Sequence, residues 1–79
     1  MIVSLSNTKD IKRKISGILD LAKQKGETGI SVVLEESMFK FVNEFMSKDK
    51  AIGMIKVAGK TFFVIKEMRI ELVKIDFYI

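Results

Sequence analysis

The tripeptide Gly59-Lys60-Thr61 is the stretch of this sequence that most suggests chemistry, because Gly-Lys-Thr ends the phosphate-binding loop G-x-x-x-x-G-K-[ST]. Such a loop opens a helix, whose N-terminus and backbone N–H groups hold the phosphates. Here the upstream glycine is Gly53, and the five residues that follow it, MIKVA, are apolar and strand-like. The residues after Thr61, FFVIKE, are also typical of a strand. We therefore predict a β-hairpin with Gly59 at a positive φ in its turn, and no bound nucleotide.

Catalytic side chains are scarce, because the chain has neither His nor Cys. This composition excludes Ser-His and Cys-His nucleophilic pairs, disulfides, and thiolate or imidazole metal sites. Glu35 and Glu36 are adjacent, so their side chains point in different directions and are typical of negative charge at a helix N-terminus. We predict a non-enzymatic protein with no metal and no cofactor.

The basic residues suggest a different kind of site. The net charge is +4 and the isoelectric point is near 9.5, a balance that permits binding to nucleic acid without requiring it. Helical spacing places four cations on the side of the first predicted helix that lies opposite its isoleucines, and two more lie in the hairpin. A solvated helix surface and a surface for phosphates both agree with this pattern. The candidate nucleic-acid-binding residues are Lys9, Lys12, Arg13, Lys23, Lys56 and Lys60.

The kind of nucleic acid is left open by the sequence. Twelve of the fourteen basic residues are Lys, which argues against base readout through Arg in the major groove. We therefore expect contacts to phosphates, in DNA or RNA.

A first helix is predicted from Lys9 onward. Asn7, with Asp10 three residues later, resembles a capping box, and Gly26 falls where a left-handed C-cap is expected. The apolar residues recur at helical spacing. They are Ile11, Ile15, Ile18, Leu19 and Ala22.

A second helix is predicted after an apolar strand at 29–34. Glu35, Glu36 and Ser37 supply negative charge and a cap for its N-terminus. Its core stripe is predicted to be Met38, Phe41, Val42, Phe45 and Met46, with Phe39 at the edge.

Four further strands complete the predicted order β-α-β-α-β-β-β. They are residues 2–5, the two arms of the hairpin, and the C-terminal segment from Arg69. In this last segment the apolar residues change parity, so we expect a bulge or break near Leu72-Val73. Right-handed crossovers place both helices on one face of a mixed sheet. We predict a single α/β (α+β) domain over residues 1–79, folded as a two-layer sandwich.

One face of such a sheet remains uncovered in a monomer. The segment TFFVI is apolar on both sides, with Phe63 and Ile65 on one face and Phe62 and Val64 on the other. Tyr78 is the one aromatic residue expected to point outward. We therefore predict a homodimer whose interface includes Phe62, Val64 and Tyr78. A protein-interaction or assembly module that uses this face or the C-terminal edge strand is the alternative to nucleic-acid binding.

The N-terminus turns polar after five residues, and no apolar run has the length of a membrane span. We expect a cytoplasmic protein that does not enter a membrane. The segment GETGISVV, followed by a helix and a hairpin, resembles the small sulfur carriers, although these use a Cys that is absent here. The element order also resembles that of Alba-type nucleic-acid-binding proteins and of the dimeric cell-division protein SepF. These likenesses concern element order alone.

Overall fold

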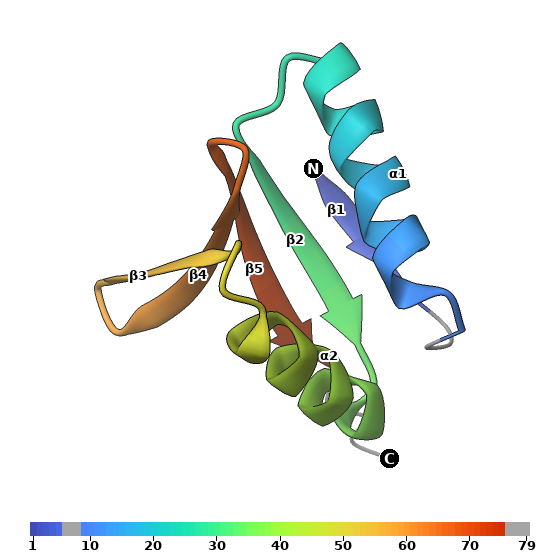
Figure 1. Ribbon diagram of the computed structural model, residues 1–79, viewed down its shortest axis with the longest axis vertical. Helices are drawn as coiled ribbons and strands as arrows, with labels where there is room; N and C mark the ends of the chain where they lie inside the picture. Colours follow the sequence, from blue (N-terminus) through green and yellow to red (C-terminus); the bar gives the residue numbers. More distant parts are fainter. Residues whose placement is uncertain (6–8, 76–79) are drawn as a thin grey trace.

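The computed structural model describes residues 1–5 and 9–75, and Figure 1 shows their arrangement. The predicted order of two helices and five strands is confirmed. The elements are β1 (Ile2–Ser4), α1 (Ile11–Gln24), β2 (Gly29–Leu34), α2 (Glu36–Lys48), β3 (Gly53–Val57), β4 (Lys60–Ile65) and β5 (Met68–Lys74).

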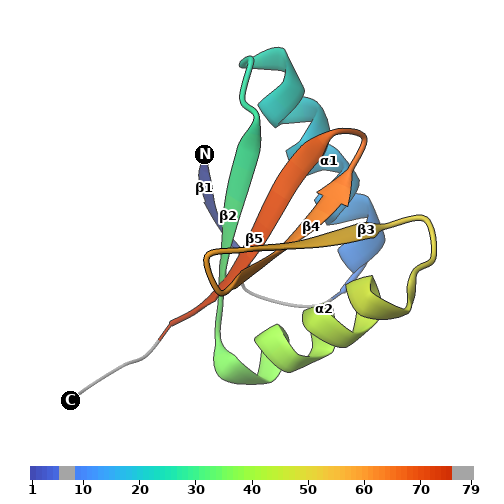
Figure 2. The ribbon, with the colours of Figure 1, turned by 90° about the vertical axis from the view of Figure 1, so that its left-hand side faces the viewer.

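The strands form one mixed sheet in the order β1-β2-β5-β4-β3. β2 pairs in parallel with β1 and β5, whereas β4 pairs antiparallel with β5 and β3. Helix α2 leads from β2 to β3 at the far edge, and the chain then returns toward the centre through β4 and β5. Both helices pack on the same face of the sheet, and within residues 1–5 and 9–75 no helix covers the other face (Figure 2). The predicted two-layer sandwich is therefore confirmed.

The core lies between the helices and the sheet. Ile30, Val32 and Leu34 alternate along β2 and are buried, as the apolar pattern of this strand predicts. Their neighbours in the core are Leu5, Ile11, Ala22, Met38, Val42, Met46, Phe63, Met68 and Ile70.

The prediction that Phe41 belongs to this core is wrong, because its side chain is 49% exposed. Helix α2 buries the i, i+4, i+8 series Met38, Val42 and Met46. Phe41 lies about 100° around the helix from the centre of that stripe, given the rotation per residue of an α-helix. The sheet therefore reaches a narrower stripe of α2 than the sequence predicts.

The N-terminus of α1 differs from the prediction. The helix begins at Ile11, and Asp10 is its N-cap with a left-handed φ of 53° and no side-chain capping hydrogen bond. Asp10 is therefore not the acidic partner of a capping box, and Asn7 lies outside the described residues. Positive φ is uncommon outside glycine, but Asp adopts it more readily than most residues.

The C-terminus of α1 is as predicted. Gly26 has a φ of 71°, and its N–H donates to the carbonyl of Lys23. The N–H of Glu27 donates to the carbonyl of Ala22. These two bonds form the Schellman motif, in which a residue without Cβ takes the left-handed position.

At the start of α2, Glu36 supplies the predicted negative charge in the first turn. The N-cap is Glu35, whose side chain makes no capping hydrogen bond. Ser37 lies inside the helix, so its predicted role as a cap is wrong.

The predicted break near Leu72-Val73 is also wrong. β5 pairs with β2 without interruption from Arg69, opposite Gly29, to Lys74, opposite Leu34. Leu72 therefore lies on the face toward the helices, and Val73 lies on the open face. The change of apolar parity in the sequence marks a second apolar face and not an irregular strand.

Both hairpins have two-residue loops with positive φ at each position. The first contains Ala58 (51°) and Gly59 (80°), which confirms the predicted hairpin and the conformation of Gly59. The second contains Lys66 (49°) and Glu67 (69°). Positive φ at both loop positions is the pattern of a type I′ turn, whose twist matches that of the strands. Lys60 and Thr61 thus begin a strand, and no helix follows Gly-Lys-Thr.

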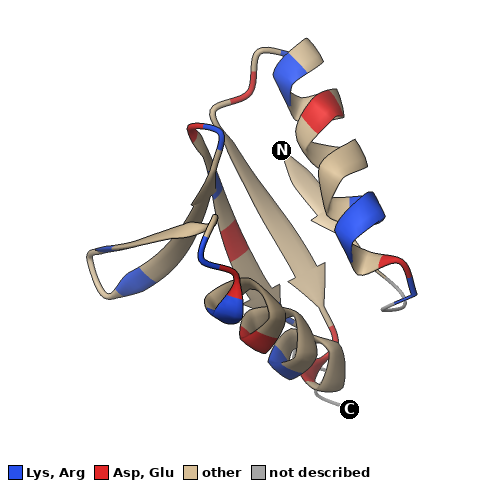
Figure 3. Ribbon diagram, in the orientation of Figure 1, with Lys and Arg blue, Asp and Glu red and all other residues tan. Residues whose placement is uncertain are grey.

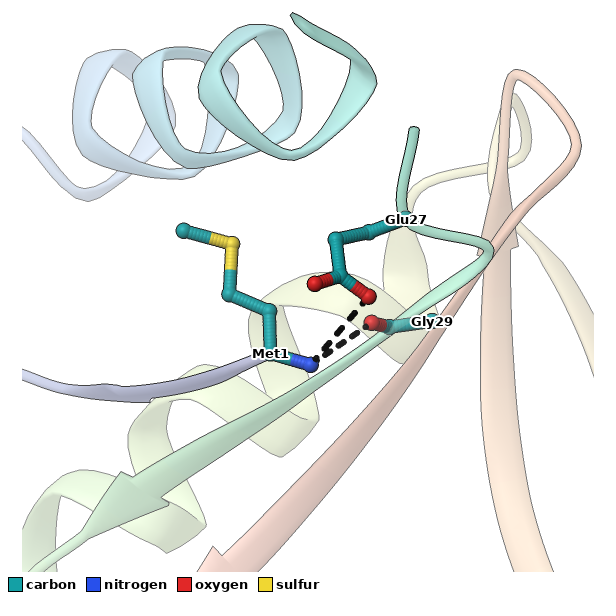
Figure 4. A network of polar contacts seen from close by, with 3 residues as sticks. All are labelled: Met1, Glu27 and Gly29. Atoms are coloured by element: carbon teal, nitrogen blue, oxygen red, sulfur yellow. Dashed lines mark hydrogen bonds and ion pairs between the residues drawn. The ribbon is translucent and has the colours of Figure 1, made fainter. Parts of the chain in front are cut away.

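The N-terminal residue before β1 makes polar contacts with the start of β2 and the residues before it. The terminal amine of Met1 lies 3.7 Å from the Glu27 carboxylate and donates to the carbonyl of Gly29 at 3.3 Å (Figure 4). The Ser31 N–H donates to the Met1 carbonyl at 2.8 Å. These contacts hold the short edge strand β1 in register.

Candidate functional site

The face of the sheet that the described helices do not cover is the first candidate surface, and we call it the open face. Strand register identifies its members, because paired residues point to the same side. Val33 lies opposite Val73, and Ile55 lies opposite Phe62. Apolar residues reach this face from every strand. They are Ile2, Val33, Ile55, Val57, Phe62, Val64 and Val73.

The exposure of these side chains varies. Ile2 is 79% exposed and Val57 is 47% exposed, whereas the other five are partly buried among their neighbours in the sheet. Phe62 and Val64, predicted as interface residues, both lie on the open face. Tyr78, the third predicted interface residue, lies outside the described residues.

Charged groups are interspersed with the apolar residues. Arg69 and Glu71 lie two positions apart on β5 and therefore share the open face. The Lys60 ammonium lies 3.9 Å from the Glu71 carboxylate. The open face thus combines an apolar surface with charges of both signs.

The six predicted nucleic-acid-binding residues are all exposed, but one chain does not bring them together. Lys12, Arg13 and Lys23 lie on α1, and Lys9 precedes this helix. Lys56 and Lys60 lie in the β3–β4 hairpin, on the opposite side of the molecule from α1 (Figures 1 and 3). The hairpin cations and the α1 cations are therefore separate surfaces within a single copy.

On α1 itself the cations gather at the two ends. Asp20 lies between the two groups, and Figure 3 shows a red band between the blue segments of α1. The larger group surrounds the N-terminus, and we call it the α1 basic cluster: Lys9, Lys12, Arg13 and Lys14. Lys14, which is not among the predicted binding residues, lies about 100° around the helix from Arg13 and is partly buried.

The α1 basic cluster opposes the electrostatics of its own helix. The first turn of α1 contains no acidic residue, although the N-terminus of a helix carries partial positive charge and favours anions. Cations at this end are unfavourable, and the exposed Lys12 and Arg13 cost about 0.3–1 kcal/mol each at low salt. An anion held at this end would relieve that repulsion.

Within residues 1–5 and 9–75, no three acidic, His or Cys side chains come close enough to hold a metal ion. The same part of the chain has no helix of the length and apolar character that a membrane span requires.

Comparison with protein-family models, with curated proteins and with solved structures finds no match to this chain. The resemblances in element order therefore assign no family, and function is inferred from the geometry described above.

Proposed function

We propose that the protein is a self-assembling module in which two copies pack their open faces together. The observation that supports this most is the set of seven apolar side chains that reach the open face from all five strands. A second apolar face on a two-layer domain usually meets a partner, because exposing it to water is unfavourable.

The size of the open face fits a second copy. Five strands of three to seven residues, spaced about 4.8 Å apart, give a flat area of at most about 24 Å by about 20 Å. Because side chains make the surface uneven, two such faces together bury about 1,000 Å² or more of accessible surface. This area is at the lower limit of specific interfaces. Interfaces of this small area are typical of transient association, so we expect the dimer to be in equilibrium with the monomer.

The charges of the open face limit how a second copy can pack. Each copy presents two cations, Lys60 and Arg69, and one carboxylate, Glu71. Face-to-face packing would require a two-fold axis placed so that the Glu71 carboxylate of each copy meets a cation of the other. Such isologous pairing gives a self-complementary surface and fixes the register of the dimer.

Analytical ultracentrifugation at about 50 µM tests this proposal, because an interface of this size is expected to be populated there. We expect the unaltered protein to sediment as a dimer and Phe62→Asp or Val64→Asp to sediment as folded monomers. Phe41→Asp is the matched control, because Phe41 is a half-exposed aromatic on the helical side. A monomeric unaltered protein, or a Phe41→Asp variant that dissociates as readily as Phe62→Asp, contradicts the proposal.

A second function is favoured by the α1 basic cluster, which would bind the phosphates of nucleic acid. Packing of the open faces leaves the helices on the two outer sides of the dimer, so each copy keeps its cluster accessible. Lys60 would then lie at the dimer interface, whereas Lys56 alternates with Ile55 and Val57 and points to the other face of the sheet. The nucleic-acid contacts would thus come from α1, including the exposed Lys9, Lys12 and Arg13, with Lys23 at the far end of the helix.

Binding to duplex and single-stranded probes as a function of salt tests this second function. Each lost phosphate contact reduces the slope of log K against log salt by about 0.9 for duplex DNA. We expect Lys12→Glu with Arg13→Glu to weaken binding to every sequence alike, whereas Lys48→Glu with Lys50→Glu, which makes the same change of charge at the end of α2, does not. Absence of binding at about 50 mM salt would exclude this function.

A further inference from the structure

A cleft of about 190 Å³ opens on the helical side of the molecule, away from the open face. It lies between α1, the end of α2 with the loop that follows, and the end of β4. We call it the interhelical cleft. Its floor consists of Ile15, Leu19, Phe45, Ile52 and Ile65.

The floor of the interhelical cleft is continuous with the core. All five floor residues are partly buried hydrophobic side chains that pack against the buried cluster. An apolar ligand group that enters the cleft therefore leaves water and contacts side chains that are already held in place by the core. Apolar floors with few polar groups at the mouth are typical of small-molecule sites.

The mouth of the cleft carries two exposed cations from different elements, Lys12 on α1 and Lys66 in the turn after β4. Asp49 also lines the mouth, but its Oδ1 accepts a hydrogen bond from the Ala51 N–H at 2.9 Å within the loop. Two ammonium groups against one carboxylate leave a net positive charge, which favours an anion over a cation or a neutral group.

The volume limits the ligand. An apolar cavity of about 150 Å³ accommodates benzene, so this cleft has space for one ring or a short branched chain and a small polar group. We propose that the interhelical cleft binds a small amphipathic monocarboxylate. The apolar part of the ligand lies on Ile15, Leu19 and Phe45, and its carboxylate lies at the mouth between Lys12 and Lys66.

Benzoate is the probe that tests this proposal, followed by amide shifts in the NMR spectrum of the full chain. We expect saturable shifts at the floor and mouth residues, with a dissociation constant of about 1 mM or below for a ligand of this size in an open cleft. Benzyl alcohol has a similar shape without the charge, and we expect it to bind about fivefold more weakly.

Two variants locate the site. Ser16 is an exposed residue at the mouth, so Ser16→Phe fills the cleft without altering the core, and we expect it to abolish the saturable shifts. Lys66→Gln should weaken benzoate binding about threefold to fivefold. Lys40→Gln, the matched control at an exposed position of α2 outside the cleft, should leave binding unchanged.

The proposal is overturned if benzoate gives no saturable shifts, if Ser16→Phe retains them in a folded chain, or if benzyl alcohol binds as tightly as benzoate. Because the cleft and the open face lie on opposite sides, Phe62→Asp should bind benzoate like the unaltered protein. Failure of the dimer and failure of the cleft are thus separate results.

Discussion

The two faces of the sheet are made by alternate residues of the same strands, yet they have different surroundings. Toward the helices, Phe63 and Ile70 are each only 2% exposed. On the other side their neighbours Phe62 and Val64 are partly buried by the sheet alone. Both faces are apolar, so the difference lies in what the rest of the chain places over them. Two helices suffice to cover one face, and the second face is available to a partner.

The faces also differ in polarity. Among the described residues, no polar or charged side chain is buried, so the centre of the covered face is apolar. At its margin the Lys74 ammonium of β5 lies 5.2 Å from the centroid of the Phe39 ring of α2. The open face instead carries Lys60, Arg69 and Glu71 among its apolar residues. Charged residues among the apolar ones favour solubility of the unbound monomer, as they do in the interfaces of non-obligate complexes.

The largest expected effect separates the two faces directly. Phe63→Ala removes a buried ring and should lower the free energy of unfolding by about 3–5 kcal/mol at every protein concentration. Phe62→Ala should instead have a small effect at low concentration, where the monomer dominates, and a larger one where the dimer is populated. Denaturant titrations at two concentrations measure both. Equal losses for the two variants at low concentration would show that the faces do not differ as described.

A smaller effect concerns the hairpin that carries Ile55 and Phe62. Gly59 has a φ of 80°, and a Cβ added there meets no atom within 4 Å, so Gly59→Ala tests backbone conformation alone. We expect a loss of about 1–2 kcal/mol in the free energy of unfolding, because L-residues disfavour left-handed φ. Gly17→Ala in α1 is the matched control, since it also meets no atom within 4 Å, and it should stabilise by about 0.5–1 kcal/mol. Thermal unfolding of both variants checks the opposite signs.

The second hairpin should respond in the opposite direction. Glu67 has a φ of 69° at a loop position where glycine is preferred. We expect Glu67→Gly to stabilise the fold by about 0.5 kcal/mol, the relief of strain being offset in part by the greater freedom of glycine in the unfolded chain. Chemical denaturation should detect the gain, and a loss of stability would argue against the type I′ turn between β4 and β5.

The smallest expected effect is on Lys60. Its ammonium is 3.9 Å from Glu71 and its side chain is 67% exposed, so Lys60→Ala should change the stability of the monomer by less than about 0.5 kcal/mol. Its effect on dimer formation should be larger, because a charge that pairs across an interface is less screened there. Sedimentation at two salt concentrations separates these roles, and an unchanged dimer would remove Lys60 from the interface.

Several parts of the fold could be predicted from local sequence. Gly26 ends α1 and Gly59 turns the first hairpin because only glycine takes positive φ without strain. Burial on α2 could not be predicted as well, since the contrast between Met38 and Phe41 depends on the rotation of the helix against the sheet. The regular path of β5 through Leu72 and Val73 could not be predicted either. A switch in the alternation of apolar residues is compatible with an irregular strand and with a regular strand that is apolar on both faces, and only the pairing of β5 with β2 distinguishes the two.

The candidate sites depended still more on tertiary structure. The exposure of Lys12 and Arg13 followed from helical periodicity, but their separation from Lys56 and Lys60 follows from the strand order, which places β3 at the far edge. The interhelical cleft unites Lys12 with Lys66, which are distant in sequence and share no motif.

The sequence by itself determined the number and order of the elements, the turn at Gly59 and the absence of His and Cys chemistry, because periodicity, backbone conformation and composition are local properties. Only the tertiary structure decided the insertion of β5 between β2 and β4, the extent of the open face and the grouping of the cations. These features arise from packing between residues far apart in the chain. Which strands pair and where the helices pack depends on how the whole chain buries its apolar surface.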